Sequence, residues 1–319
     1  MPVAAEIRTP SATKNIAPVK SIGAGLLLAV LGAIAFSGKA IIVKLAYRYG
    51  VDAVTLIMLR MLFALPIFAL MAWWASRGQA ALTRRDWLGV VWLGFTGYYL
   101  ASFLDFAGLA YISASLERLI LYLNPTLVML LGLLLYRRRV LQGQIIGMAI
   151  SYCGVALVFG HELVQQGLSE RSGTALGGLL VFLSAISYAV YLVYSGEMVR
   201  RIGSLRLVGL ASTVACLCCL LQFVLLRPIS SAFAVAPEVV WLSLLNATLC
   251  TAVPVLLVMM AIERIGASMA AQTGMIGPMS TIVMGVLILG EPFTAWVAVG
   301  SALVIAGILV FSRAGRSPA

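Results

Sequence analysis

Charged residues are scarce in this chain: Asp, Glu, Lys and Arg together make up only 10% of its 319 residues. A soluble domain carries roughly 25%. Hydrophobic residues account for 62% of the chain instead, and its mean hydropathy is +1.06. With so few charges the chain could not cover a folded surface in water. The shortage of charge therefore excludes an ordinary soluble protein.

The residues of common catalytic and metal sites are few or isolated. The one histidine, His161, is followed by Glu162, but Gln165 stands where an HExxH zinc motif needs its second histidine. The five cysteines lie inside apolar segments, where we expect small packing residues rather than metal ligands or disulfides. No GxSxG, P-loop or GxGxxG motif is present. We therefore expect no metal, no cofactor and no enzymatic activity, and the missing P-loop argues against ATP-driven pumping by this chain.

Long apolar runs fill the sequence instead. A helix needs roughly 20 apolar residues to cross a hydrocarbon core about 30 Å thick, and in lipid such runs must be helical to satisfy their backbone. We expect tails at 1–21 and 313–319 and an external connection at 161–174, which separates a first unit, 22–160, from a second, 175–312. The ten predicted spans are 22–45, 53–76, 87–110, 114–136, 140–160, 175–199, 204–227, 239–262, 267–289 and 294–312.

The net charge of +11 lies mostly in the short loops, where it orients the chain in the membrane and does not indicate a nucleic-acid partner. If the N-terminus is inside, fifteen Lys and Arg residues fall on the cytoplasmic side. The outer loops then hold only Arg48, Arg171 and Arg227. Cytoplasmic loops carry the excess of Lys and Arg. The bias predicts that both termini are cytoplasmic.

Glycine, serine and proline positions in the two halves match at a constant offset of 153 residues. Each half has five spans, an odd number, so the second half must cross the membrane in the opposite sense. The sequence therefore predicts an all-α membrane protein of ten transmembrane helices in two inverted five-helix repeats, a common transporter design. The matching pairs are Gly25 with Gly178, Gly50 with Gly203, Ser115 with Ser268, Pro125 with Pro278, Gly132 with Gly285, Gly147 with Gly300, and Gly154 with Gly307.

Several short segments occur in a fixed order along this framework. They are 36–44 (FSGKAIIVK), Leu59-Arg60, 112–115 (ISAS) with Asn124-Pro125, 266–268 (GAS) with Gly277-Pro278, and 290–292 (GEP). Together they resemble EamA-type members of the drug/metabolite transporter superfamily, and the resemblance covers about residues 22–312. It implies a ten-helix exporter of metabolites in a bacterial inner membrane. The first repeat departs from the pattern, because Arg137-Arg138 stands where the second has Gly290-Glu291.

Six ionisable residues lie within the predicted spans, where charges are costly and mark functional sites. All six fall in the outer half of the first repeat. Lys44 ends its span, and we expect its ammonium to reach the headgroups. The others are either a structural ion-pair network or a site for substrate or coupling ion. Under the second hypothesis the cations Lys39, Arg60 and Arg118 attract a carboxylate or phosphate of the substrate. The carboxylates Asp105 and Glu117 are then the partners of these cations or proton carriers.

Uncharged polar and aromatic residues near mid-depth are further candidates for contact with substrate. Such residues also serve as hydrogen-bonding contacts between helices, worth about 0.6 kcal/mol each. Pro125 and Pro278 are expected to break spans 4 and 9, and the freed carbonyls would then face a cavity. The polar and aromatic candidates are Tyr98, Tyr99, Tyr122, Asn124, Tyr188 and Gln272.

These features predict a secondary active transporter that exports a small metabolite or amino-acid-like compound by alternating access. The partners expected are a small-molecule substrate and the lipid bilayer, with proton coupling possible, in a monomer or a homodimer. A passive channel or facilitator is the alternative, because polar groups along a path serve both, and a membrane-embedded enzyme is a weaker one.

Overall fold

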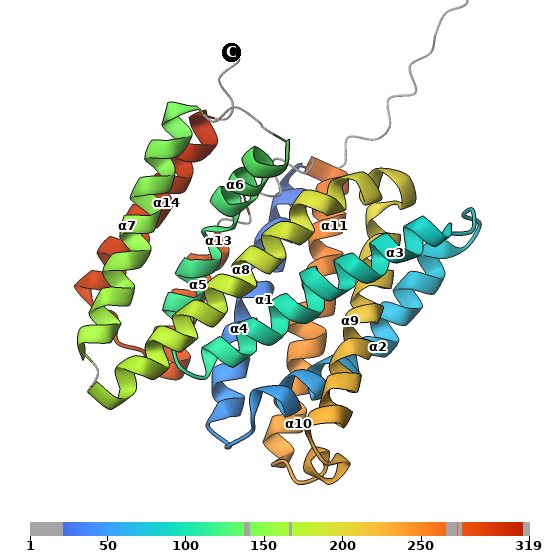
Figure 1. The fold of residues 1–319 in the computed structure, drawn as a ribbon, viewed down its shortest axis with the longest axis horizontal. Coiled ribbons are helices and arrows are strands. Elements are labelled where there is room, and N and C mark those ends of the chain that lie inside the picture. Colours follow the sequence, from blue (N-terminus) through green and yellow to red (C-terminus); the bar gives the residue numbers. More distant parts are fainter. Residues whose placement is uncertain (1–21, 137–140, 166–167, 266–272, 274–275, 315–319) are drawn as a thin grey trace, which may run out of the picture.

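The computed structural model describes residues 22–136, 141–165, 168–265, 273 and 276–314, and this part contains helices and connections but no strand (Figure 1). The first half contributes α1 (Ile22–Tyr47), α2 (Ala53–Ser76), α3 (Arg84–Leu93), η1 (Gly94–Leu100), α4 (Ala101–Leu109), α5 (Ala114–Leu121), α6 (Asn124–Tyr136) and α7 (Gln142–Gln165). The second contributes α8 (Leu168–Ile202), α9 (Ser204–Leu226), η2 (Ile229–Ala232), α10 (Pro237–Ala247), η3 (Thr248–Ala252), α11 (Val253–Ile265), α13 (Ile276–Met284), η4 (Gly285–Leu289) and α14 (Ala295–Ala314).

These elements make up ten spans. Among the described residues, eight helical stretches are long and apolar enough to cross a membrane, and two shorter apolar helices, Met279–Leu289 and Ala295–Phe311, complete the set. Three spans combine helical elements without a break: α3, η1 and α4 run on continuously, as do α10, η3 and α11, and α13 continues into η4. Large apolar side chains such as Leu134 and Trp74 are exposed on the outside of the bundle, as expected for a surface that faces lipid. The predicted ten-helix membrane fold is confirmed.

The predicted external connection between the two halves, residues 161–174, is largely helical. Helix α7 continues to Gln165 and α8 begins at Leu168. His161 and Arg171 are polar, yet a helix that extends beyond the hydrocarbon core needs no apolar side chains there. The polar residues of this segment therefore indicate where the chain leaves the hydrocarbon core, and they do not indicate where the helices end.

The contacts between the halves follow a pseudo-twofold arrangement. A shift of 153 residues matches α1 with α8, α2 with α9, α4 with α11, α6 with α13 and α7 with α14. In the structure α1 packs along α11 and α4 packs along α8, while α1 contacts α13 and α6 contacts α8. The same exchange maps the pairs α2–α9 and α7–α14, which are also in contact, onto themselves. Each half therefore packs against the other through equivalent helices.

The α7–α14 contact lies on this pseudo-twofold axis. A Cβ atom added to Gly147 would lie 2.5 Å from the carbonyl oxygen of Gly307, and one added to Gly154 would lie 2.6 Å from that of Gly300. Between them the Ser151 hydroxyl, which donates to the Gly147 carbonyl of its own helix at 3.0 Å, lies 3.4 Å from the carbonyl oxygen of Val304, its counterpart 153 residues later. Small residues let the two backbones approach this closely.

Two kinds of local backbone irregularity also occur in pairs. Gly50 and Gly203, which are 153 residues apart, both have positive φ, 75° and 85°. Gly50 follows the end of α1 by three residues, and Gly203 directly follows α8. The π-helix η1 in the third span and the π-helix η3 in the eighth span occupy matching positions as well. The repeat therefore extends from helix packing to the backbone conformation of single turns.

Candidate functional site

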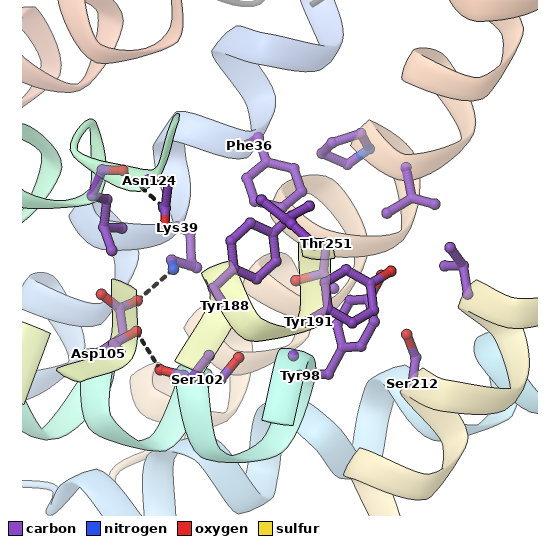
Figure 2. Close-up of a pocket in the computed structure, with 18 of the residues that line it drawn as sticks. Phe36, Lys39, Tyr98, Ser102, Asp105, Asn124, Tyr188, Tyr191, Ser212 and Thr251 are labelled. Atoms are coloured by element: carbon purple, nitrogen blue, oxygen red, sulfur yellow. Dashed lines mark hydrogen bonds and ion pairs between the residues drawn. The ribbon is translucent and has the colours of Figure 1, made fainter. Parts of the chain in front are cut away.

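A cavity of about 830 Å³ lies between the two halves. In the first half α1, α2, η1, α4, α5 and α6 line it, and in the second half α8, α9, η3, α11 and α13. Pockets for small molecules have volumes of roughly 300–1,000 Å³, so the cavity is large enough for a metabolite. Figure 2 shows Lys39, Asp105 and Asn124 on one side of it and Tyr98, Tyr191 and Ser212 on the other.

Lys39 and Asp105 form an ion pair in the wall of the cavity. The Lys39 Nζ atom lies 2.5 Å from Asp105 Oδ2, and the two side chains are only 11% and 2% exposed. The contact joins α1 to α4 (Figure 2). A pair this deeply buried is stable only because each charge neutralises the other.

Glu117 and Arg118 are neighbours on α5. Arg118 lines the cavity, whereas Glu117 is fully buried behind it. The closest contact between their charged groups, from Arg118 Nε to Glu117 Oε2, is 3.7 Å. Glu117 also interacts electrostatically with Asp105 and Lys39. The four residues therefore form one connected charge cluster, called the α1–α4–α5 cluster below.

Arg60 links the two halves across the cavity. It is 5% exposed on α2, and its Nε and Nη2 atoms donate to the Thr251 hydroxyl of η3 at 3.2 and 3.1 Å. Its guanidinium also lies 5.2 Å from the centre of the Phe106 ring. The Thr251 hydroxyl in turn donates to the carbonyl of Asn246 at 2.8 Å. The guanidinium of Arg60, from the second span, therefore lies between Phe106 of the third span and Thr251 of the eighth span.

Aromatic rings form another part of the wall. Tyr188 and Tyr191 on α8 stack with their ring centres 5.5 Å apart, and the rings of Tyr98 and Tyr191 meet edge to face at 5.1 Å. The hydroxyls of Tyr98 and Tyr191 are 3.1 Å apart, within hydrogen-bond distance. Phe36 of α1 also lines the cavity (Figure 2).

Most of the residues proposed from the sequence line this cavity, but not all of them. Tyr99 points elsewhere and packs against Phe95 with 5.2 Å between the ring centres. Gln272 lies outside the described residues. Pro278 belongs to α13, its side chain lies outside the described part of the structure, and the residue before it, Gly277, lines the cavity. The predicted residues that do line the cavity are Lys39, Arg60, Tyr98, Asp105, Arg118, Tyr122, Asn124, Pro125 and Tyr188.

The fourth span is interrupted where its Asn-Pro pair stands. Helix α5 ends at Leu121 and α6 begins at Asn124, whose side-chain amide donates to the carbonyl of Leu121 at 2.8 Å. Asn124 and Pro125 line the cavity, and so does Gly277, the residue 153 positions after Asn124. The break therefore places freed backbone and a polar side chain beside the cavity.

Lys44, the ionisable residue at the end of its predicted span, contacts the end of α4 and the connection that follows it. Its ammonium donates to the carbonyls of Leu109, at 3.3 Å, and Ile112, at 2.9 Å, at the end of α4. The last carbonyls of a helix have no partner within the helix, so they are available to accept hydrogen bonds from a nearby cation. Lys44 therefore helps to join α1 to α4.

Further hydrogen bonds join the helices at the end of the bundle opposite the first residue of α1, called the Glu291 end below. Arg48 donates to the carbonyl of Leu289 at 2.6 Å. The Glu291 carboxylate accepts from the backbone amides of Ala114, at 2.7 Å, and Ser115, at 3.3 Å, and from the Ser115 hydroxyl at 2.7 Å. Both contacts cross between the halves, so they tie the repeats together at this end.

Several residues of the cavity wall were not among the predicted site residues, including Ser37, Thr251, Leu192 and Val258. The repeat could have located three of them. The offset of 153 residues carries Tyr98 to Thr251, Lys39 to Leu192 and Asp105 to Val258, and all six residues line the cavity. Apolar residues at functional positions are not recognisable by residue type, but symmetry identifies them.

A ten-helix membrane protein with a cavity enclosed by two repeats is the arrangement of transporters. The family model described as the EamA-like transporter family matches this chain twice, at residues 23–160 and 175–313. The chain belongs to the EamA-like transporter family, which confirms the resemblance inferred from its motifs.

Similar proteins agree with this assignment. An uncharacterized transporter of Bacillus subtilis (strain 168), YcbK, is 29% identical over 279 residues, which cover 86% of this chain and 88% of the relative. An uncharacterized transporter of Archaeoglobus fulgidus is 25% identical over 88% of this chain and 95% of its own length. A solved crystal structure matches 93% of this chain and 100% of its own with a TM-score of 0.59. At 18% identity that likeness shows the fold alone.

Proposed function

We propose that this chain is a secondary active transporter that exports a small metabolite or an amino-acid-like compound across a bacterial inner membrane by alternating access. Both termini are cytoplasmic in this proposal, as the charge bias of the loops favours. The Glu291 end then faces outward. The protein works as a monomer or a homodimer, since its ten spans enclose the cavity without a partner.

The observation that carries this proposal is the position of the cavity between the two repeats. Both halves contribute to its wall, so a rocking motion of one half against the other would change which side has access to it. Arg60 and Thr251 come from opposite halves and meet at the cavity, at 3.1 Å. A ligand there would contact both moving parts.

The test is transport by the full chain in two steps. Metabolite profiling of the medium, with and without overexpression, identifies compounds that accumulate outside cells. Proteoliposomes then measure uptake of those compounds. A carrier saturates and shows counterflow, in which unlabelled substrate inside drives labelled substrate inward. Transport that neither saturates nor shows counterflow would indicate a channel and contradict the proposal.

We include in the proposal that Asp105 and Glu117 carry protons. Both are buried carboxylates in the α1–α4–α5 cluster, close enough to interact. Asp105→Asn and Glu117→Gln should each weaken the response of transport to a pH gradient, whereas Glu238→Gln, at an exposed position on α10, should not. Undiminished pH-dependent transport by both the Asp105 and the Glu117 variant would remove this role.

A further inference from the structure

The charges in and against the cavity do not balance. In the described part of the chain the cations are Lys39, Arg60 and Arg118, and the carboxylates are Asp105 and Glu117. Lys39 is paired with Asp105 at 2.5 Å, and Arg118 contacts Glu117 at 3.7 Å. With Asp105 and Glu117 both ionised, one positive charge is left over. In the membrane interior an uncompensated charge is costly, so the site favours a ligand that brings one negative charge.

Unused hydrogen-bond donors accompany the excess charge. Among the described residues, Arg60 Nη1 and Arg118 Nε and Nη2 are buried nitrogen atoms with no hydrogen-bond partner. The 3.7 Å contact of Arg118 Nε with Glu117 is beyond hydrogen-bond length. Both arginines line the cavity. Buried donors are almost always paired in proteins, and a carboxylate is the acceptor that suits the planar guanidinium group.

The remainder of the wall suits an aromatic body. In Figure 2 the rings of Phe36, Tyr188 and Tyr191 gather on one side of Lys39. Much of the rest is aliphatic, including Val255 and Val258 of α11. Aromatic rings pack well face to face with an offset or edge to face, as the tyrosines here already do with each other.

We propose that the cavity binds an aromatic monocarboxylate as its anion, with Arg60 and Arg118 donating to the carboxylate and the aromatic body lying against Tyr188 and Phe36. This inference rests on the proposed transport function and narrows its substrate class. A zwitterionic amino acid fits less well, because its ammonium needs an uncompensated carboxylate in the wall, whereas Lys39 already neutralises the charge of Asp105 and Glu117 is buried behind the wall. A zwitterion also leaves the excess charge of the cavity in place.

The test is binding to the purified full chain in lipid nanodiscs, measured by calorimetry with four matched probes. These are 3-phenylpropanoate, its neutral amide 3-phenylpropanamide, the amino acid phenylalanine, and 3-cyclohexylpropanoate. The acid should bind about thirtyfold or more tightly than the amide or phenylalanine, as expected for a buried charge pair. The cyclohexyl acid should bind about fivefold more weakly than the phenyl acid.

Two variants assign these preferences to residues. Arg60→Gln should weaken binding of the acid about thirtyfold and leave binding of the amide unchanged, a difference that misfolding cannot produce. Arg206→Gln is the matched control, since Arg206 is buried but bonds to Ser76 and Ala80 away from the cavity. Tyr188→Leu should abolish the preference for phenyl over cyclohexyl, whereas Tyr194→Leu, an exposed tyrosine of the same helix, should keep it.

Phenylalanine or the amide bound as tightly as the acid would overturn the inference, and so would equal weakening of acid and amide by Arg60→Gln. The proposed function would survive that result, because counterflow of whatever compound the cells export tests it separately. Conversely, tight binding of the acid without counterflow of any compound would support the site and contradict the transporter mechanism.

Discussion

At the residue scale, the Lys39–Asp105 pair shows how costly charge inside a membrane protein is kept stable. Asp105 is 2% exposed, so removal of Lys39 leaves a carboxylate with neither water nor its partner. We expect Lys39→Met to destabilise the protein by roughly 3–5 kcal/mol. The double variant Lys39→Met/Asp105→Leu should recover much of that loss, because it removes both charges.

Thermal unfolding of the purified protein measures the difference. The exposed pair Asp52–Arg227, with 3.3 Å between its charged atoms, provides the control. Arg227→Met should change stability by about 1 kcal/mol at most, as for other surface pairs. A double variant no more stable than Lys39→Met would show that packing, and not the buried charge, dominates at this position.

Asp52 allows a test of charge outside the spans. Burial alone would raise the pKa of its carboxyl, but hydrogen bonds from Thr55 and the charge of Arg227 outweigh burial, so the pKa lies below its usual value of 3.8. The ionised form therefore stabilises the folded protein above pH 3.8, and this stabilisation is lost as pH falls through the lower folded pKa. Asp52→Asn should lower the unfolding temperature at neutral pH and match the wild type at sufficiently acid pH. A difference that is the same at every pH would contradict this assignment.

At the element scale, the α7–α14 pair depends on the absence of side chains. A Cβ at position 147 would lie 2.5 Å from the Gly307 oxygen and 2.5 Å from the Phe311 nitrogen, both backbone atoms that cannot move aside alone. Gly147→Ala should therefore separate the helices and lower the unfolding temperature. Gly160→Ala, on the same helix with no atom within 4 Å of the added Cβ, is the control and should leave it unchanged or raise it.

The first turn of α5 is held by the second repeat through Glu291. Glu291→Ala removes the acceptor of the Ala114 and Ser115 amides, and we expect faster hydrogen–deuterium exchange of that turn. Glu291→Gln, which keeps one acceptor oxygen, should have an intermediate effect, and Glu238→Ala none. Unchanged exchange in Glu291→Ala would show that the contact does not hold the turn. The matching position of the first repeat is Arg138, whose side chain has no acceptor, so the same chemistry cannot be repeated in the first half.

The elements were predictable to different degrees. Runs of about twenty apolar residues located the ten spans because lipid permits little else. The π-helices η1 and η3 were not foreseen, since no residue type requires an extra residue in a turn. They bring Tyr98 and Thr251 to the cavity from matching positions, and such irregular turns are common at functional sites.

At the scale of the whole molecule, the charge bias of the loops predicts which residues face the cytoplasm. In a variant without the native cysteines, Ser230→Cys lies in the connection before α10 and Gln79→Cys in the connection before α3, both exposed. A membrane-impermeant maleimide should label position 230 in intact cells and position 79 only after permeabilisation. The opposite pattern would reverse the orientation.

The symmetry of the whole was readable from seven residue pairs, whereas the composition of the site was not. Sequence placed Lys39, Arg60, Asp105 and Arg118 in one half of one repeat, but depth in the membrane does not say which side chains meet. Tyr99 and Tyr98 are adjacent in sequence, and only Tyr98 lines the cavity. Which neighbour points inward depends on the rotation of a helix whose turn is irregular.

The surplus of one cation in the cavity has an electrical consequence. If both carboxylates stay ionised through the cycle, each anion exported carries one negative charge out of a cell whose interior is negative. A potential of 100 mV then contributes about 2.3 kcal/mol per molecule, enough for roughly a fiftyfold outward concentration ratio. If a proton leaves with the anion, no net charge moves. Currents recorded from proteoliposomes on a solid support distinguish the two, and a steady current would make the membrane potential itself the energy source for export.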